Sequence, residues 1–392
     1  MVKTIAHLAD IHIRKLHRFV EYRQVFKKLY KQLKELKPDA IYIGGDVVHG
    51  KLDTSPEEVR MVANFFLELC KIAPTIVIPG NHDCNLNNKS REDTLSPIVD
   101  LVQKIVPNLH YWKKSGVYKL DGVDFGVMSI FDHDKEGNQL IDNLPNPKEL
   151  GDKKIALFHG GVDKHLYDNN FAVTDERVSN ETFEGYDIVM LGDIHKRQFL
   201  NEEETIAYPG SLIQQNYSED PSHGFLLWDL ETKKATYHQV ENDYGYKILR
   251  VEKGEILNST TGNPFELTFM PPKGRVKIKF WDTTLEQIKD IQIGLRKQYP
   301  KLKEIVTERQ DNISIGDDRE NKLDIGDVRD VNYQNELIED FLKRNVDNID
   351  EATIKRVQEI NDMTNNSPEI YDGDITRNVD WKIKSFEFDN MF

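Results

Sequence analysis

Five short blocks of aspartate, histidine and asparagine constrain this chain most, because each block directly follows a short apolar segment. The blocks begin at Asp10 (DIH), Gly45 (GDVVH), Gly80 (GNHD), His159 (HGG) and Gly192 (GDIH). In open α/β sheets, ligand sites lie beyond the carboxyl ends of the strands. If the apolar segments are strands, the five blocks converge on one rim of a sheet.

Apolar strand-like segments alternate with helical segments through the first part of the chain. Residues 4–8, 40–44 and 75–78 are short apolar runs typical of buried strands. Residues 18–37 and 55–72 instead space their apolar side chains as one face of a helix. This alternation predicts a layered α/β sheet.

Further short strands are expected before a change of pattern near residue 244. They cover residues 117–120, 123–129, 154–158, 187–191, 225–228 and 234–239. The following region has a different order of elements, with a helix at 284–298 between strand-like runs at 246–252, 265–269, 275–281 and 302–308. The sequence therefore predicts a first domain at 1–243 and a small α+β domain at 244–310.

The remainder of the chain divides by composition. Residues 311–331 are rich in Asp, Asn and Gly, which is typical of an acidic linker. Two amphipathic helices are expected within 332–365, at 332–344 and 350–363. The tail at 366–392 ends in WKIKSFEFDNMF, which alternates like a strand. It could add an edge strand to a partner or begin a fused partner.

Size and charge limit the classes of function. The 392 residues, 38% of them hydrophobic, are enough for two or three domains with real cores. The formal net charge of -15 argues against a generic nucleic-acid coat, but bound divalent metals supply positive charge where a phosphate must lie. Two cysteines form no disulfide framework, and no signal peptide or membrane span is expected. We therefore expect a soluble, cytoplasmic protein.

The residue types in the five blocks point to metal chemistry. Carboxylate, imidazole and amide oxygen donors suit divalent ions such as manganese, magnesium, iron or zinc. Eight such donors are enough for two ions, and a two-metal site activates water for in-line attack on phosphorus. One carboxylate must bridge the ions, and Asp46 on the second expected strand is the natural candidate.

The order D-x-H, GD, GNH, H-G and GD-x-H resembles the calcineurin-like metallophosphoesterase superfamily. Within it, the segments GGDVVHG, PGNHD and AYPGSL resemble the SbcD family, which includes the phage recombination endonucleases. That family is the nuclease half of SbcCD-type and meiotic-recombination-type break-repair complexes. The resemblance is sharp over residues 1–230. It implies a β-sandwich core with helices on both faces, a small α+β capping domain and a C-terminal helical partner-binding segment.

Roles are implied residue by residue. Asp10, His12 and His195 would hold one ion, Asn81, His159 and Asp193 the other, and Asp46 would bridge them. The resemblance implies that His82 stabilises charge on the phosphate or protonates the leaving oxygen, and that His49 orients the substrate or His82.

One departure from the family bears on the metal. Family members usually read G-H-x-H in the last block, whereas this chain has a carboxylate at Asp193. A carboxylate adds negative charge and hardens the site. The two divalent ions are therefore expected to be Mn²⁺, with Mg²⁺ as the alternative.

The resemblance also implies partners. Arg14, Lys15 and Arg18 follow the first block, and we expect them to grip the DNA backbone. Residues 332–363 match the placement of the segment that binds an SbcC-type, SMC-like ABC ATPase. The family forms homodimers through the region of helices 55–72 and 93–105, although simple packing on the sheet explains their apolar residues equally well.

Three other functions compete with a DNA endo- or exonuclease acting on ends, hairpins or overhangs. A protein phosphatase or a cyclic-nucleotide phosphodiesterase of the same superfamily would use the same chemistry, but the modular C-terminus and the YPGS block disfavour both. A non-catalytic scaffold for the ATPase is the third. A fold that has lost its metals is disfavoured because no expected ligand position holds an apolar residue.

Overall fold

The computed structural model divides into two compact units, Met1–Asn312 and Ile313–Phe392. It describes the following residues: 1–14, 18–50, 54–86, 88, 91–134, 139–167, 172–174, 177–257, 270–310, 335, 338–339, 342–343 and 349–366.

The first unit contains a six-stranded sheet with the order β12-β11-β1-β2-β3-β4. Strands β1 to β4 are parallel, whereas β11 and β12 continue the sheet antiparallel on the side of β1. The strands are β1 (Thr4–Leu8), β2 (Ala40–Ile43), β3 (Thr75–Val77), β4 (Leu109–Tyr111), β11 (Gly224–Asp229) and β12 (Lys234–Gln239).

A second six-stranded sheet has the order β5-β6-β7-β8-β10-β9. Its central strands β6, β7, β8 and β10 are parallel, and β5 and β9 close the two edges antiparallel. The strands are β5 (Gly116–Leu120), β6 (Val123–Met128), β7 (Lys154–His159), β8 (Ile188–Gly192), β9 (Gln198–Phe199) and β10 (Ile206–Tyr208).

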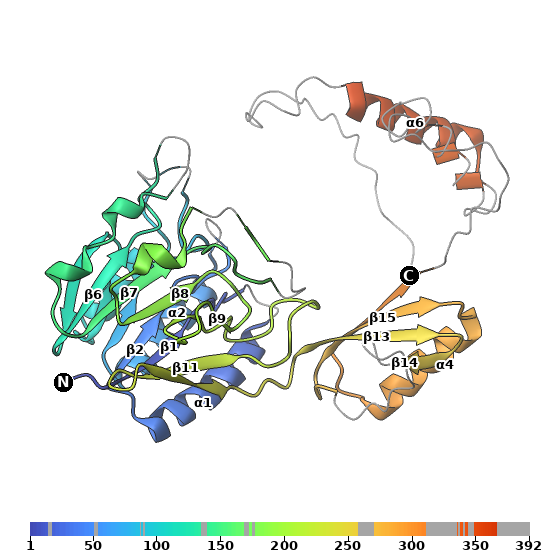
Figure 1. Ribbon diagram of the computed structural model, residues 1–392. Helices are drawn as coiled ribbons and strands as arrows, with labels where there is room; N and C mark the ends of the chain where they lie inside the picture. The colour runs from blue at the N-terminus through green and yellow to red at the C-terminus, as the bar shows by residue number, and fades with distance from the viewer. Residues whose placement is uncertain are drawn as a thin grey trace. The chain divides into compact units, whose positions relative to one another are not determined.

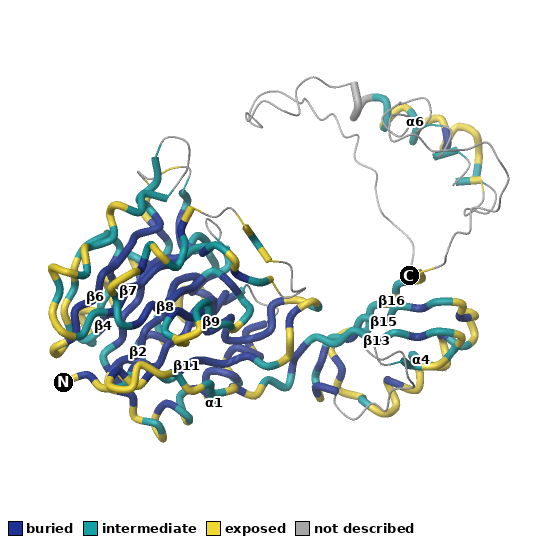
Figure 2. The backbone as a smooth tube through the Cα atoms, in the orientation of Figure 1, coloured by how far each residue is buried: buried dark blue, intermediate teal, exposed yellow. Residues whose placement is uncertain are grey.

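The two sheets face one another across an apolar core (Figures 1 and 2). Ile5, Tyr42 and Trp228 of the first sheet belong to one buried cluster with Phe125 and Leu157 of the second. Alternating side chains of a strand point to opposite faces, so each sheet supplies one apolar face to this core. The arrangement is the β-sandwich that the sequence predicts.

Three α-helices cover the outer face of the first sheet: α1 (Phe19–Leu36), α2 (Pro56–Cys70) and α3 (Ser96–Gln103). The predicted apolar face of α1 is buried, with Leu36 only partly so. Helix α2 begins as predicted, because the Ser55 side chain accepts a hydrogen bond from the Glu58 amide at 3.2 Å and Pro56 occupies the first turn.

The outer face of the second sheet is covered by loops and short 3-10 helices. Three of these are η2 (Ile141–Asn143), η3 (Pro147–Glu149) and η4 (Asn180–Phe183). Phe183 of η4 is buried in a cluster with Phe158 and Leu191 of the sheet, and Ile141 packs against that cluster. The fold class is therefore confirmed as a layered α/β sandwich with helices on both faces.

A four-stranded sheet with the order β14-β13-β15-β16 forms the remainder of the first unit. Its strands are β13 (Tyr246–Glu252), β14 (Glu255–Leu257), β15 (Arg275–Trp281) and β16 (Glu304–Arg309), and helix α4 (Leu285–Gln298) packs on it. The predicted bounds of β13 and β15 are met. The predicted strand at 265–269 lies outside the described residues.

In the second unit, helix α6 (Glu351–Asn366) matches the helix predicted at 350–363. Most of the predicted helix at 332–344 and the tail at 366–392 lie outside the described residues. The domain boundaries at 243, 310, 331 and 365 stay predictions. No helix among the described residues is long and apolar enough to span a bilayer.

The start of α3 depends on one buried carboxylate, which gives a stability prediction. Asp93 is 3% exposed, accepts hydrogen bonds from Ser96 and Tyr111, and pairs with Lys113 at 2.5 Å. Burial acts to raise its pKa, but these bonds outweigh burial and hold the pKa below its usual range. We expect Asp93→Asn to lower the free energy of unfolding at neutral pH by about 2–4 kcal/mol.

The pH dependence has a defined sign. The pKa of Asp93 is lower in the folded protein than in the unfolded chain. Its contribution to the free energy of unfolding is therefore complete above the ordinary carboxyl pKa and is lost as pH falls through the pKa of the folded protein. Urea unfolding of the unchanged chain and of Asp93→Asn, at neutral and at acidic pH, measures this contribution. The control is Asp100→Asn, on the exposed side of α3. An equal effect of the two substitutions would contradict it.

Candidate metal centre

The carboxyl ends of strands from both sheets meet at one place. The amide of Asp10, after β1, donates to the Gly45 carbonyl after β2 at 3.1 Å, and the His12 amide donates to the Asp46 carbonyl at 2.9 Å. On the second sheet, the Gly160 amide after β7 donates to Gly192 at the end of β8 at 3.1 Å. The predicted convergence of the strand ends is therefore observed.

Four of the predicted ligands have a backbone conformation that residues other than glycine rarely adopt. The φ angles are 52° at Asp10, 49° at His12, 52° at Asp46 and 99° at Asp193. Such conformations each cost about 1–3 kcal/mol and concentrate at functional sites. The packing of the surrounding sandwich must offset this conformational cost.

Two glycines of the blocks allow the loops to approach closely. A Cβ at Gly80 would lie 2.2 Å from Oδ1 of Asp46. Gly45 has φ +89°, and a Cβ there would lie 2.4 Å from Nδ1 of His159. Only glycine fits at either position, so these residues of the blocks serve the packing of the site.

Asp46 lies at the centre of the polar cluster. Its Oδ2 is 3.5 Å from Nε2 of His12, and its Oδ1 is 3.5 Å from Nε2 of His159. Nε2 of His159 is also 3.7 Å from Oδ1 of Asp193. Asp10, Asp46 and His159 offer ligand atoms within 4.8 Å of one another, and so do Asp10, His12 and His195. These two groups share Asp10. The predicted assignment of Asn81, His159 and Asp193 to one ion, with Asp46 as the bridge, stays a prediction.

The hydrogen bonds of the imidazoles aim their other nitrogens at the cluster. Nδ1 of His195 lies 2.8 Å from the Glu219 carboxylate, and Nδ1 of His159 lies 2.6 Å from the Gly44 carbonyl. A ring that donates from Nδ1 leaves a lone pair on Nε2, which is the arrangement of metal-bound histidine. Nε2 of His195 faces Nε2 of His12 at 2.9 Å.

Three predicted ligands have buried polar atoms that fit a cation. Oδ1 of Asp10, Oδ1 of Asn81 and Nε2 of His159 have no hydrogen-bond partner among the described residues. Unpaired buried polar atoms are costly and rare, and such atoms on carboxylate, amide and imidazole groups fit bound divalent metal. The donor set of the site therefore fits metal ions.

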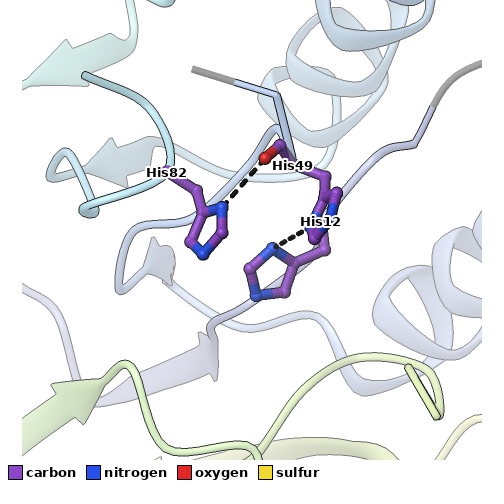
Figure 3. A group of neighbouring side chains, drawn as sticks. All are labelled: His12, His49 and His82. Atoms are coloured by element: carbon purple, nitrogen blue, oxygen red, sulfur yellow. Dashed lines mark hydrogen bonds between the residues drawn. The ribbon is translucent and has the colours of Figure 1, made fainter. Parts of the chain in front are cut away.

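His82 and His49 lie at the edge of this cluster (Figure 3). The His82 amide donates to Oδ1 of Asp46 at 2.7 Å, and its Nδ1 lies 2.8 Å from the His49 carbonyl. Nδ1 of His49 lies 3.4 Å from Nδ1 of His12, and the rings of His49 and His82 are stacked. Both are half-buried, as are the predicted ligands Asn81, Asp193 and His195, whereas the other predicted ligands are buried.

The protonation of the site follows from crowding of buried acids and imidazoles. Burial raises the pKa of Asp10 to about 6 and lifts the pKa of Asp46 well above its usual range. Burial acts to lower the pKa of His159, but the Asp46 and Asp193 charges outweigh it and raise the pKa to about 9.

The pKa values of His195 and His49 shift in opposite directions. Burial acts to lower the pKa of His195, but its bond to Glu219 and the Asp10 charge raise the pKa to about 9. Burial and then the Arg14 charge lower the pKa of His49 to about 4. In the ordinary pH range His49 is therefore neutral, while His159 and His195 hold protons where metal would bind.

The three predicted DNA-binding residues have different environments. Arg14 donates from Nε to Gln215 at 3.1 Å and lines a cavity beside the site. Arg18 is 4% exposed and donates four hydrogen bonds, to Glu21, Gln214 and Gln215, so it acts mainly as an internal support. Lys15 lies outside the described residues.

Sequence reasoning missed Glu219 as part of the site. Its carboxylate is fully buried and orients His195, and it also accepts from the Gln215 amide. Glu219 follows no strand, and only its spacing before His223 could have drawn attention. Asp83 of the third block instead caps the turn after β3, because its carboxylate accepts a hydrogen bond from the Gly80 amide at 2.8 Å.

Comparison with known proteins places this site in a family. The sequence model of the calcineurin-like phosphoesterases matches residues 3–197, which contain all five blocks. This region belongs to the calcineurin-like metallophosphoesterase superfamily, whose members use divalent metals.

Individual relatives are viral and bacterial. The chain is 36% identical to uncharacterized protein R555 of Acanthamoeba polyphaga mimivirus over 99% of its own length, but it spans only 29% of that relative. It is 22% identical to the putative phosphoesterase 244L of Invertebrate iridescent virus 6, covering 62% of this chain and 80% of the relative. It is 23% identical to an SbcCD nuclease subunit of Staphylococcus epidermidis, covering 79% of this chain and 87% of the relative.

The raised pKa values predict proton release on metal binding. At neutral pH the site holds protons on His159 and His195, whose pKa values are near 9. Because ligands must be deprotonated, Mn²⁺ displaces these protons, and its affinity rises as pH increases from about 6 towards 9. Calorimetric titration in two buffers with different ionisation enthalpies measures the release. Identical binding heats in the two buffers would contradict this protonation of the site.

Proposed function

We propose that this chain is a two-metal-ion DNA nuclease that hydrolyses phosphodiester bonds. The observation that carries the proposal is the pair of ligand groups that share Asp10, together with Asp46 of one group, whose carboxylate accepts a hydrogen bond from the His82 amide. The likeness to an SbcCD nuclease subunit over 79% of the chain favours DNA over other phosphoesters.

The proposed metal ligands are seven residues of the five blocks. Asp10, His12 and His195 would hold one ion, Asn81, His159 and Asp193 would hold the other, and Asp46 would bridge the two. The carboxylate-rich donor set favours Mn²⁺ or Mg²⁺. Two bound ions supply an activated water and neutralise charge on the phosphoryl oxygens.

The chain's own residues position the reaction. Glu219 fixes the ring of His195, and the Gly44 carbonyl fixes the ring of His159, so the ligand nitrogens are already aimed before metal enters. His82 is held in turn by the His49 carbonyl at Nδ1, which directs its Nε2 toward the phosphate. From this position His82 stabilises charge on the phosphate or protonates the leaving oxygen.

Partners and location follow from the same proposal. DNA contacts Arg14 and Lys15, and an SMC-like ABC ATPase binds about residues 332–363. Homodimers form through α2 and α3, where Val59 and Leu101 are 39% and 64% exposed, and Ile105, just after α3, is 68% exposed. Such a nuclease acts in the cytoplasm, on DNA ends or hairpins.

A phosphatase of the same superfamily is the second candidate function. The likeness to a putative phosphoesterase of an iridescent virus is the observation that favours it. A phosphatase would hydrolyse small phosphate monoesters and leave DNA intact.

Cleavage of labelled DNA tests the proposal. We expect the chain, alone or with its ATPase partner, to cut end-labelled duplex or hairpin DNA in Mn²⁺ and not in chelator. His82→Ala should lower the rate by roughly 10²–10⁴-fold, since it removes a proton donor or charge stabiliser. The matched control His110→Ala changes a half-buried histidine of β4 and should leave the rate unchanged.

Two results would contradict the proposal. Hydrolysis of small monoesters with intact DNA would identify a phosphatase. An unchanged rate in the His82→Ala protein would remove this residue from the chemistry.

A further inference from the structure

A cavity of about 390 Å³ lies beside the metal centre and is lined by residues of two structural parts. The sandwich contributes Arg14, Arg18, His49 and Glu58 to its walls, and the four-stranded sheet contributes Tyr246 and Arg275. A cavity of this size is in the range of sites for small ligands. His49 connects it to the metal centre, since its Nδ1 is 3.4 Å from Nδ1 of His12.

A buried carboxylate fixes two of the guanidinium groups. Glu21 is 1% exposed and accepts hydrogen bonds from Arg18 at 2.8 and 2.9 Å and from Arg275 at 3.1 Å. Both guanidinium groups also lie over the Tyr246 ring, at 5.5 and 5.0 Å from its centroid. A long side chain held in this way loses little further entropy when it binds a ligand.

Arg18 and Arg275 differ in what they still offer. Arg18 uses four of its five donors within the protein. Arg275 donates to Glu21 and to the Tyr244 carbonyl, so the bonds among the described residues leave it with donors for a ligand. Arg14 has one hydrogen bond, from Nε to Gln215, and no carboxylate partner in the described part of the chain.

The charges around the cavity do not cancel. Arg14, Arg18 and Arg275 carry three positive charges, and Glu21 and Glu58 carry two negative ones. Among the described residues that line the cavity or pair with its arginines, one positive charge therefore remains, in a chain whose formal net charge is -15. A phosphodiester carries one negative charge, and arginine forks are suited to bind its oxygens.

We propose that this cavity is a second phosphate subsite, in which Arg14 and Arg275 bind a phosphodiester next to the one being cleaved. The inference rests on the proposed nuclease function. It assigns to the four-stranded sheet a direct part in holding the strand, because Arg275 reaches the cavity from β15. It also assigns Arg18 and Glu21 the role of positioning residues that hold Arg275 in place.

Binding of a labelled oligothymidylate at several salt concentrations tests this subsite. Every protein carries His82→Ala and Mn²⁺, so that the strand stays intact, which a gel checks. Each phosphate contact to a single strand contributes about 0.7 to the slope of log affinity against log salt. Arg275→Ala should therefore reduce that slope by about 0.7 and weaken binding by about tenfold.

Two further variants and a control separate this role from a structural one. Arg275→Lys keeps the charge and should retain the slope with weaker binding. Arg14 does not pair with Glu21, so Arg14→Gln should reduce the slope by about 0.7 as well and tests the subsite even if the Arg275→Ala protein unfolds. Lys289→Ala removes a charge from the exposed side of α4 and should change neither quantity.

The outcomes distinguish the subsite from the nuclease itself. Unchanged slopes for both Arg275→Ala and Arg14→Gln would overturn the subsite, even if the chain that keeps His82 cuts DNA. The slopes could instead fall while the chain that keeps His82 leaves DNA intact in the presence of its ATPase partner. The phosphate subsite would then stand, and the nuclease proposal would fail.

Discussion

The crowding of buried carboxylates between two sheets is the constraint on which the site depends. Asp10 and Asp46 are 0% and 2% exposed, and Asp193 approaches the same His159. Buried acids of like charge repel one another and are costly to desolvate unless cations pair with them. Protonated imidazoles supply part of this positive charge, and bound divalent ions would supply the remainder. The site is therefore arranged for metal before any ligand arrives.

The sandwich makes this arrangement possible by opposing strand ends from two sheets. Asp10, His12 and Asp46 keep positive φ angles because the strands behind them are buried on both faces. A residue in such a conformation persists only when its surroundings determine it fully. The four-stranded sheet joins through Glu21 and Arg275, so the wall of the neighbouring cavity is fixed by a buried ion pair.

Local patterns in the sequence predicted the elements that depend on local spacing. The bounds of β1 and β13 and the buried face of α1 follow from apolar periodicity, and the start of α2 follows from Ser55 and Pro56. The blocks at strand ends likewise indicated which side chains converge.

Features that depend on distant contacts were not visible in the sequence. Strands β9 and β10 are two and three residues long, too short to show a period. The burial of Glu21 on the apolar side of α1 depends on its neighbour Arg18 and also on Arg275, which lies 254 residues away in the chain. Glu219 was missed for the same reason, because its role is set by the position of His195.

The most direct test of the account is the location of metal in crystals grown with Mn²⁺, by anomalous diffraction. The account predicts two peaks about 3.5–4 Å apart on either side of Asp46, with Asn81 and His159 at one and His12 and His195 at the other. A single peak, or peaks that Asp46 does not bridge, would contradict it.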